Sequence, residues 1–281
     1  MEHGNSMHKL RTKLKTLFRL LTSDSVSFGF LLRYAFGQLL AYSGIGKYIS
    51  FSTSNYRLYL TRSPVAMVAY GSPHISRDEE LVAQDILVDG DICLDIGANI
   101  GTFSLVASGV VGETGKVIAF EAHPVTASYM EKNISLNKKT NISLVQKALG
   151  EKAGVIGFSN DGYDDVNHVA VESKLKVEIV RLDDCNEIQH IQTIKLIKLD
   201  VEGFELFVLQ GGEKTFSKAQ YVLFEAFDKN CKQFGYSVKD LYSWFESHGF
   251  TLINQDTKSS LNIEKSGQDF LCNVLAVRNS P

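Results

Sequence analysis

Short apolar runs alternate with amphipathic segments over most of the chain. The apolar runs predict strands over residues 91–97, 115–121, 142–148, 194–200 and 221–225, and helices are predicted between them over 102–108, 125–137, 204–210 and 238–248. Such alternation is typical of a parallel sheet with right-handed crossovers. The last two apolar runs, 250–253 and 270–277, have no helix between them, so we expect an antiparallel pair at the C-terminal end.

The first 70 residues follow a different pattern, which predicts a helical N-terminal extension ahead of an α/β domain over residues 71–281. Residues 9–21 form one apolar helical stripe with basic residues on the remaining surface. This segment is either a helix that rests on an anionic membrane or an ordinary helix packed on the domain. Residues 26–49 predict a second helix, and 56–70 have the strand character of a hairpin or lid.

Composition and charge narrow the class of protein. The net charge is -3 with a pI of about 6.2, so no basic field indicates a nucleic-acid partner. The four cysteines are scattered without metal-type spacing, as expected for reduced thiols in a cytoplasmic protein. The apolar run over residues 26–42 is shorter than the roughly 20 residues that a membrane-spanning helix needs. We therefore expect a cytoplasmic protein, with contact at the inner face of the membrane only if residues 9–21 bind there.

The segment from Asp91 to Ser104 has the order of a buried strand, a tight glycine turn and a helix start. Gly97 and Gly101 allow positive φ and a close approach to a ligand. Asn99 occupies the place of the second glycine in the dinucleotide pattern G-x-G-x-x-G, so a close pyrophosphate fit is disfavoured. We expect Asp95 to point into the ligand space, where a carboxylate suits a cation or an amine rather than a phosphate.

A second acid, Glu121, ends the next predicted strand. An acid at this position accepts hydrogen bonds from the 2′- and 3′-hydroxyls of a ribose. Together with the glycine turn it indicates a ribonucleoside that carries an amine or sulfonium at its other end. S-adenosylmethionine fits this description.

Several motifs of the chain, in this order, resemble the FkbM family of S-adenosylmethionine-dependent methyltransferases. They are Leu94-Asp95-Ile96-Gly97-Ala98-Asn99-Ile100-Gly101, Phe120-Glu121-Ala122-His123-Pro124, Asn133-Ile134-Ser135-Leu136-Asn137, Lys147-Ala148-Leu149-Gly150, Arg181-Leu182-Asp183-Asp184 and Ile197-Lys198-Leu199-Asp200-Val201-Glu202-Gly203-Phe204-Glu205. The resemblance covers residues 78–250, and Ala122 departs from the proline that the family often has there.

The resemblance implies a Rossmann-like, doubly wound, seven-stranded class I fold and an O-methyltransferase that acts on hydroxyls of saccharides, glycolipids or secondary metabolites. It also implies the contacts of the methyl donor. The turn with Asp95, Gly97, Asn99 and Gly101 would follow the methionine moiety, and Glu121 would bind the ribose. Lys147 and Ala148, at the end of the third strand, would approach the adenine.

The candidate catalytic residues are Asp200, Glu202 and Glu225, at the ends of the fourth and fifth strands. A hydroxyl acceptor must lose its proton, and a carboxylate at the transfer point can remove it. The same residues could instead cap the following helices, or supply oxygen ligands to a divalent cation. We expect no metal, because no residue pattern requires one.

Two other functions stay open at this point, a nicotinamide-dependent oxidoreductase and a non-catalytic scaffold that binds S-adenosylmethionine. Asn99 and the lack of a Tyr-x-x-x-Lys pair disfavour the first, and the intact acids at the strand ends disfavour the second. The acceptor is expected to be a small molecule or a glycan. Its identity and the oligomeric state cannot be read from the sequence.

Overall fold

The computed structural model describes residues 28–159, 168–170, 172–255, 257–261 and 271–279. The basic stripe over residues 9–21 lies outside this part. Seven strands form the central sheet in the order β11-β12-β10-β9-β3-β4-β5. They are β3 (Ile92–Ile96), β4 (Lys116–Phe120), β5 (Ile142–Val145), β9 (Ile194–Leu199), β10 (Ala219–Phe227), β11 (Phe250–Asn254) and β12 (Leu271–Arg278). The first five are parallel and β12 is antiparallel to both its neighbours, as predicted.

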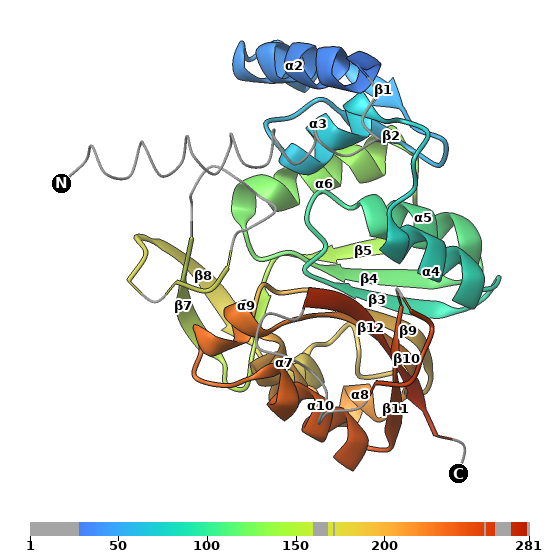
Figure 1. Cartoon of the computed structure of the whole chain (residues 1–281), viewed down its shortest axis with the longest axis vertical. Coiled ribbons are helices and arrows are strands. Elements are labelled where there is room, and N and C mark those ends of the chain that lie inside the picture. Colours follow the sequence, from blue (N-terminus) through green and yellow to red (C-terminus); the bar gives the residue numbers. More distant parts are fainter. Residues whose placement is uncertain (1–27, 160–167, 171, 256, 262–270, 280–281) are drawn as a thin grey trace.

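Helices cover both faces of this sheet (Figure 1). On one side lie α4 (Asp78–Ile86), α5 (Thr102–Val111) and α6 (Pro124–Leu136), and on the other α7 (Glu205–Gly211), α8 (Glu213–Phe216), α9 (Asp228–Lys232) and α10 (Val238–Ser247). Successive residues of a strand point to opposite faces, so Cys93 packs with Phe103 of α5 while Leu94 belongs to the core with Val208 of α7. The doubly wound fold is confirmed.

The third predicted strand is shorter than expected. β5 ends at Val145, and the Lys147 amide donates to the Val145 carbonyl in a turn. Ala148–Leu149 form β6, which belongs to a second sheet with β7 (Gly154–Phe158) and β8 (Leu175–Val180). A 3-10 turn, η3 (Leu182–Asp184), follows. The prediction of one strand through residue 148 was wrong because the pairing of Ala148 with Ile179 draws the chain away.

The N-terminal extension contains α2 (Phe28–Tyr42), η1 (Gly46–Tyr48), β1 (Ser50–Ser52), β2 (Arg57–Tyr59) and α3 (Pro64–Gly71). β1 and β2 form the hairpin. The strand expected after Pro64 is instead the helix α3, because Ser63 caps it by accepting the Ala66 amide and Pro64 fits its first position. The division of the chain at residue 70 stays a prediction.

Side-chain hydrogen bonds attach the hairpin to the α/β part. Tyr56 donates to Glu80 of α4 at 2.7 Å, and the Tyr59 amide donates to Asn133 of α6 at 3.0 Å. Asn133 is fully buried and also donates to the Ile100 carbonyl in the glycine turn. Among the described residues, no helix has the length and apolar content needed to cross a membrane.

Candidate active site

The glycine turn between β3 and α5 has the conformation that its sequence requires. Gly97, Asn99 and Gly101 all have positive φ, which glycine adopts freely and asparagine tolerates. A Cβ at Gly97 would lie 1.8 Å from the Asp200 carbonyl oxygen, so only glycine fits where the turn crosses the end of β9. Gly101 precedes α5 and packs on Met130. The turn is therefore pressed against the strand that carries the candidate catalytic segment.

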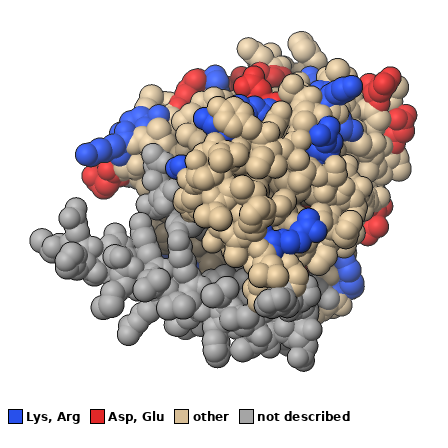
Figure 2. All heavy atoms as spheres, turned by 90° about the horizontal axis from the view of Figure 1, so that it is seen from above, with Lys and Arg blue, Asp and Glu red and all other residues tan. Residues whose placement is uncertain are grey.

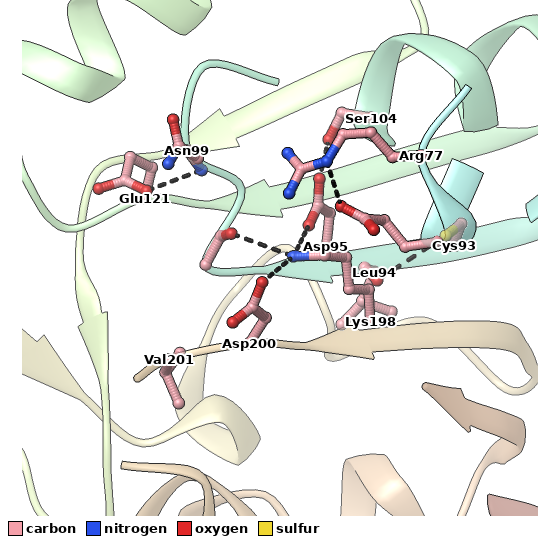
Figure 3. Close-up of polar contacts among 12 residues, drawn as sticks. Arg77, Cys93, Leu94, Asp95, Asn99, Ser104, Glu121, Lys198, Asp200 and Val201 are labelled. Atoms are coloured by element: carbon pink, nitrogen blue, oxygen red, sulfur yellow. Dashed lines mark hydrogen bonds and ion pairs between the residues drawn. The ribbon is translucent and has the colours of Figure 1, made fainter. Parts of the chain in front are cut away.

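Glu121 joins the glycine turn to the loop after β4 (Figure 3). One carboxylate oxygen accepts the Asn99 amide at 2.9 Å and the other accepts the His123 amide at 2.8 Å. A carboxylate has about four lone-pair positions, so two backbone amides do not exhaust its capacity to accept hydrogen bonds. The contact of Glu121 with a ribose diol stays a prediction.

Asp95 does not point into open space as expected from the sequence. Its side chain is fully buried beneath the turn, where it accepts the Ser104 hydroxyl at 2.6 Å and lies 3.8 Å from the Lys198 ammonium. Burial raises the pKa of Asp95, against the opposing effects of Lys198 and Ser104. A direct contact of its carboxylate with the methyl donor stays a prediction, and the geometry gives Asp95 a supporting position.

Lys198 is the centre of the polar network, and the sequence did not indicate it. Its ammonium contacts Asp200 at 3.0 Å, Asp95 at 3.8 Å and the Gly97 carbonyl oxygen at 3.4 Å (Figure 3). Burial alone would lower the pKa of Lys198, but Asp200 and Asp95 outweigh it and the pKa is raised. Lys198 therefore stays charged and holds the turn, Asp95 and Asp200 together.

A cavity of about 250 Å³ opens beside this network at the carboxyl ends of β3, β4, β9 and β10. Most of the predicted site residues line it, and these are Gly97, Asn99, Glu121, Lys147, Ala148, Asp200, Glu202 and Glu225. Asp95 and Gly101 are absent from its wall. Lys147 reaches it although its amine pairs with Glu178 at 2.7 Å. One cavity thus brings the predicted donor residues and the predicted catalytic residues together.

The three acids on the acceptor side differ in their surroundings. Asp200 is held in the ion pair with Lys198. Glu202 has positive φ in the turn after β9 and accepts Asn230 at 2.8 Å, and burial followed by repulsion from Asp200 and Glu225 raises its pKa to about 8. Burial and repulsion from Asp200 raise the pKa of Glu225 to about 7, and no hydrogen bond or ion pair engages it within the described structure.

Glu205 holds the backbone of the turn that follows β9 and carries Glu202. Its buried carboxylate accepts the amides of Val201 and Gly203, at 3.2 and 3.1 Å. The Tyr236 hydroxyl donates to the Gly203 carbonyl at 2.7 Å. Glu205, rather than Glu202, is therefore the residue that caps the turn, and the Glu202 side chain is available to the cavity. Within the described residues, no three His, Cys, Asp or Glu side chains are grouped to hold a metal ion.

Comparison with known families decides which class of protein this site belongs to. The model of the Methyltransferase FkbM domain matches residues 95–252, more than half of the chain. The chain belongs to the FkbM methyltransferase family. The family and its methyl donor, as expected from the sequence, are confirmed, and the nicotinamide alternative is not supported.

Named relatives of this FkbM domain act on different compounds. The hexuronic acid methyltransferase AglP of Haloferax volcanii is 28% identical over 139 residues, which cover 49% of this chain and 56% of the relative. The chain thus spans little more than half the length of that protein. The 31-O-demethyl-FK506 methyltransferase FkbM of Streptomyces tacrolimicus is 26% identical over 200 residues, covering 58% of this chain and 74% of the relative.

A solved structure with a similar fold is a putative rRNA methylase from Clostridium thermocellum. It has a TM-score of 0.47 and 11% identity, and the similarity covers 74% of this chain and 98% of that one.

Two charged residues of the cavity precede the matched FkbM segment. Arg77 and Glu79, at the start of α4, both line the cavity and pair at 3.0 Å. Neither lies in a motif of the family resemblance, which is why sequence reasoning missed them. An arginine just ahead of the acid-rich first turn that contains Glu79 was the available signal, but such a pattern is typical of any exposed helix.

Proposed function

We propose that this FkbM enzyme transfers the methyl group of S-adenosylmethionine to a hydroxyl of a saccharide, glycolipid or secondary metabolite. The observation that carries the proposal is the shared cavity. Glu121 and the glycine turn line its donor side, while Glu202 and Glu225 line its acceptor side. The FkbM relatives support a small-molecule or sugar acceptor.

Glu225 is our candidate for the base. In the proposed step the acceptor oxygen attacks the methyl carbon, the carbon–sulfur bond breaks, and its electron pair stays on sulfur as a neutral thioether. The hydroxyl proton passes to the Glu225 carboxylate. A pKa of about 7 suits this role near neutral pH, and such a base adds about 10²–10⁴-fold to the rate. Asp200, paired with Lys198, would orient the acceptor instead.

The charges around the acceptor side favour an acceptor without a carboxylate. Arg77 pairs with Glu79, and Lys198 pairs with Asp200, so both cations are already neutralised. Glu202 and Glu225 remain as acids without an ion pair in the described structure. An anionic sugar would meet Glu225, which is partly ionised near pH 7, whereas a neutral polyol can form hydrogen bonds with both acids, of which Glu202 is largely protonated at that pH. We therefore propose a neutral hydroxyl compound as the acceptor.

The place of action is also a proposal. A cytoplasmic enzyme that meets an anionic membrane through residues 9–21 is consistent with the basic stripe of that segment. Removing residues 1–27 should then lower binding to anionic vesicles and leave the affinity for S-adenosylhomocysteine unchanged.

Calorimetry with S-adenosylhomocysteine tests the donor site directly. We expect binding by the wild type and at least about tenfold weaker binding by Glu121→Gln, because a neutral amide accepts the ribose hydroxyls less well. Glu131→Gln, an exposed acid on α6, is the control and should bind like the wild type. Absence of binding by the wild type, or binding of NAD in its place, would refute the proposal. Formation of S-adenosylhomocysteine from S-adenosylmethionine with neutral glycan acceptors then tests transfer.

A further inference from the structure

The helix α2 exposes an apolar face that nothing in the described structure covers. Six large apolar side chains between residues 32 and 48 are each at least half exposed, and they are Leu32, Phe36, Leu39, Tyr42, Ile45 and Tyr48. We call these six residues the α2 surface. Leu32, Phe36 and Leu39 are four and three residues apart, so they lie on one side of the helix. Contiguous exposed apolar surface on this scale is typical of an interaction site.

The opposite side of α2 packs against α3. The exposed apolar side is therefore additional to the side that the helix needs for packing in the fold. Gly37 lies against the Tyr70 ring of α3, and Gly71 of α3 lies against the Phe30 ring. Arg33 donates to the Tyr70 carbonyl oxygen at 3.1 Å and closes the same contact. The helix is therefore apolar on both sides, and the part of the chain that the structure describes packs against only one of them.

Basic residues accompany the α2 surface and acids are missing from it. The chain has no Asp or Glu between Phe28 and Arg77, although the remainder of the chain up to Pro281 is acidic. Lys47 lies beside the Tyr48 ring and Arg62 beside the Tyr42 ring, each within 5.6 Å of the ring centre. Figure 2 views the molecule from the α2 end and shows a broad uncharged surface with scattered Lys and Arg, while Asp and Glu gather toward its edges.

We infer that the α2 surface docks on an anionic lipid bilayer. Exposed aliphatic and aromatic side chains next to basic groups that form no ion pair within the described residues match the boundary between acyl chains and acidic headgroups. A second copy of this chain fits less well, because a symmetric contact would bring Lys47 and Arg62 of both copies together. Residues 9–21 fit less well for the same reason, because that segment is basic too.

The position of the surface gives the docking a consequence for the enzyme. Val65, in the first turn of α3, lines the cavity, and α3 packs directly on α2. Arg77, which follows α3, lines the same cavity. A bilayer bound at the α2 surface would therefore be separated from the cavity wall by α3.

Flotation of the full chain with vesicles tests the inference. The vesicles contain phosphatidylcholine alone, or phosphatidylcholine with one third phosphatidylglycerol. We expect binding to the anionic vesicles that weakens with added salt, and at least about tenfold weaker binding to the neutral ones. Phe36→Asp/Leu39→Asp and Lys47→Glu/Arg62→Glu should each reduce anionic binding about tenfold or more.

Val155→Asp is the matched control, because Val155 is 72% exposed on β7, outside the α2 surface. It should bind vesicles like the wild type. Unchanged affinity for S-adenosylhomocysteine in every variant shows that each is folded. Wild-type protein that ignores anionic vesicles would overturn the inference, as would Phe36→Asp/Leu39→Asp protein that binds them like the control. Concentration-dependent self-association that these two substitutions abolish, without vesicle binding, would assign the surface to a second copy instead.

Discussion

Replacing Lys198 with methionine tests whether the buried network holds the site together. Methionine keeps much of the side-chain volume and removes the ammonium that contacts Asp95 and Asp200. Among the described residues, Asp95 would then keep only the Ser104 hydroxyl as a partner for its fully buried carboxylate. The substitution therefore separates the charge of Lys198 from its packing.

The distances give the expected magnitude. At an effective dielectric constant of about 20, contacts of 3.0 and 3.8 Å correspond to about 5.5 and about 4.4 kcal/mol of attraction. The attraction between Lys198 and Asp200 must be reduced, because the Asp200 side chain is 35% exposed and screened by water. Desolvation of Lys198 opposes both by several kcal/mol, and removing one partner of a buried ion pair costs about 3–5 kcal/mol. We expect a loss of about 3 kcal/mol in the free energy of unfolding.

The pH dependence distinguishes this cause from a simple packing defect. Without Lys198, the pKa of Asp95 rises further above its unfolded value, so the variant gains relative stability where Asp95 is protonated and loses it as pH rises. Urea unfolding should therefore show a larger deficit at pH 8 than at pH 5, by at least about 1 kcal/mol. Lys195→Met, on the same strand, should cost less than about 0.5 kcal/mol. A deficit below about 1 kcal/mol, or one independent of pH, would refute this account of Lys198.

Three further substitutions test the site and its supports. Glu225→Gln should lower kcat/KM by about 10²–10⁴-fold. It should also remove the fall in kcat/KM below about pH 7, the acidic limb of the pH profile, where the wild-type base is protonated. An acidic limb that remains in this variant would mean that another residue is the base. Gly97→Ala should destabilise by more than about 2 kcal/mol in urea unfolding, because its Cβ would overlap a backbone carbonyl; Gly154→Ala, with open space around it, is the control, and equal effects would contradict the argument. Asn133→Ala should cost about 2–3 kcal/mol by leaving a half-buried amide and a buried carbonyl without their partner, whereas the exposed Asn55→Ala should be nearly neutral; a similar cost for both would contradict this argument.

Most of the central sheet could be predicted because its strands are buried on both faces and read as continuous apolar runs. Two secondary-structure predictions were wrong, the first for a local reason and the second because of pairing with a distant strand. Val65–Tyr70 has the composition of a strand, yet Ser63 and Pro64 together start a helix, and that start outweighs the composition. The break after Val145 depends on pairing with β8, about 30 residues further along the chain, and no local pattern contains it.

From the sequence, only the site residues that lie at or just after the end of a predicted strand could be found. Glu121 and Asp200 follow apolar runs directly, so their place at the carboxyl edge of the sheet follows from the sequence. Lys198 lies inside such a run, and its importance depends on register. In the structure Asp95 of β3 and Lys198 of β9 are direct partners across the sheet. Strands about 100 residues apart in sequence had to be placed side by side before this pair could be recognised.

The pairing of Asp95 with Lys198 across the sheet also links the glycine turn to Glu225, the proposed base. Lys198 holds the turn through Asp95 and the Gly97 carbonyl oxygen, and it also lowers the pKa of Glu225, against burial and Asp200, which raise it to about 7. Loss of the Lys198 charge should therefore raise the pKa of Glu225. In Lys198→Met protein that remains folded, the acidic limb of kcat/KM should move to higher pH, while Lys195→Met leaves it in place. A limb that stays near pH 7 in both variants would mean that the network positions the turn without tuning the base.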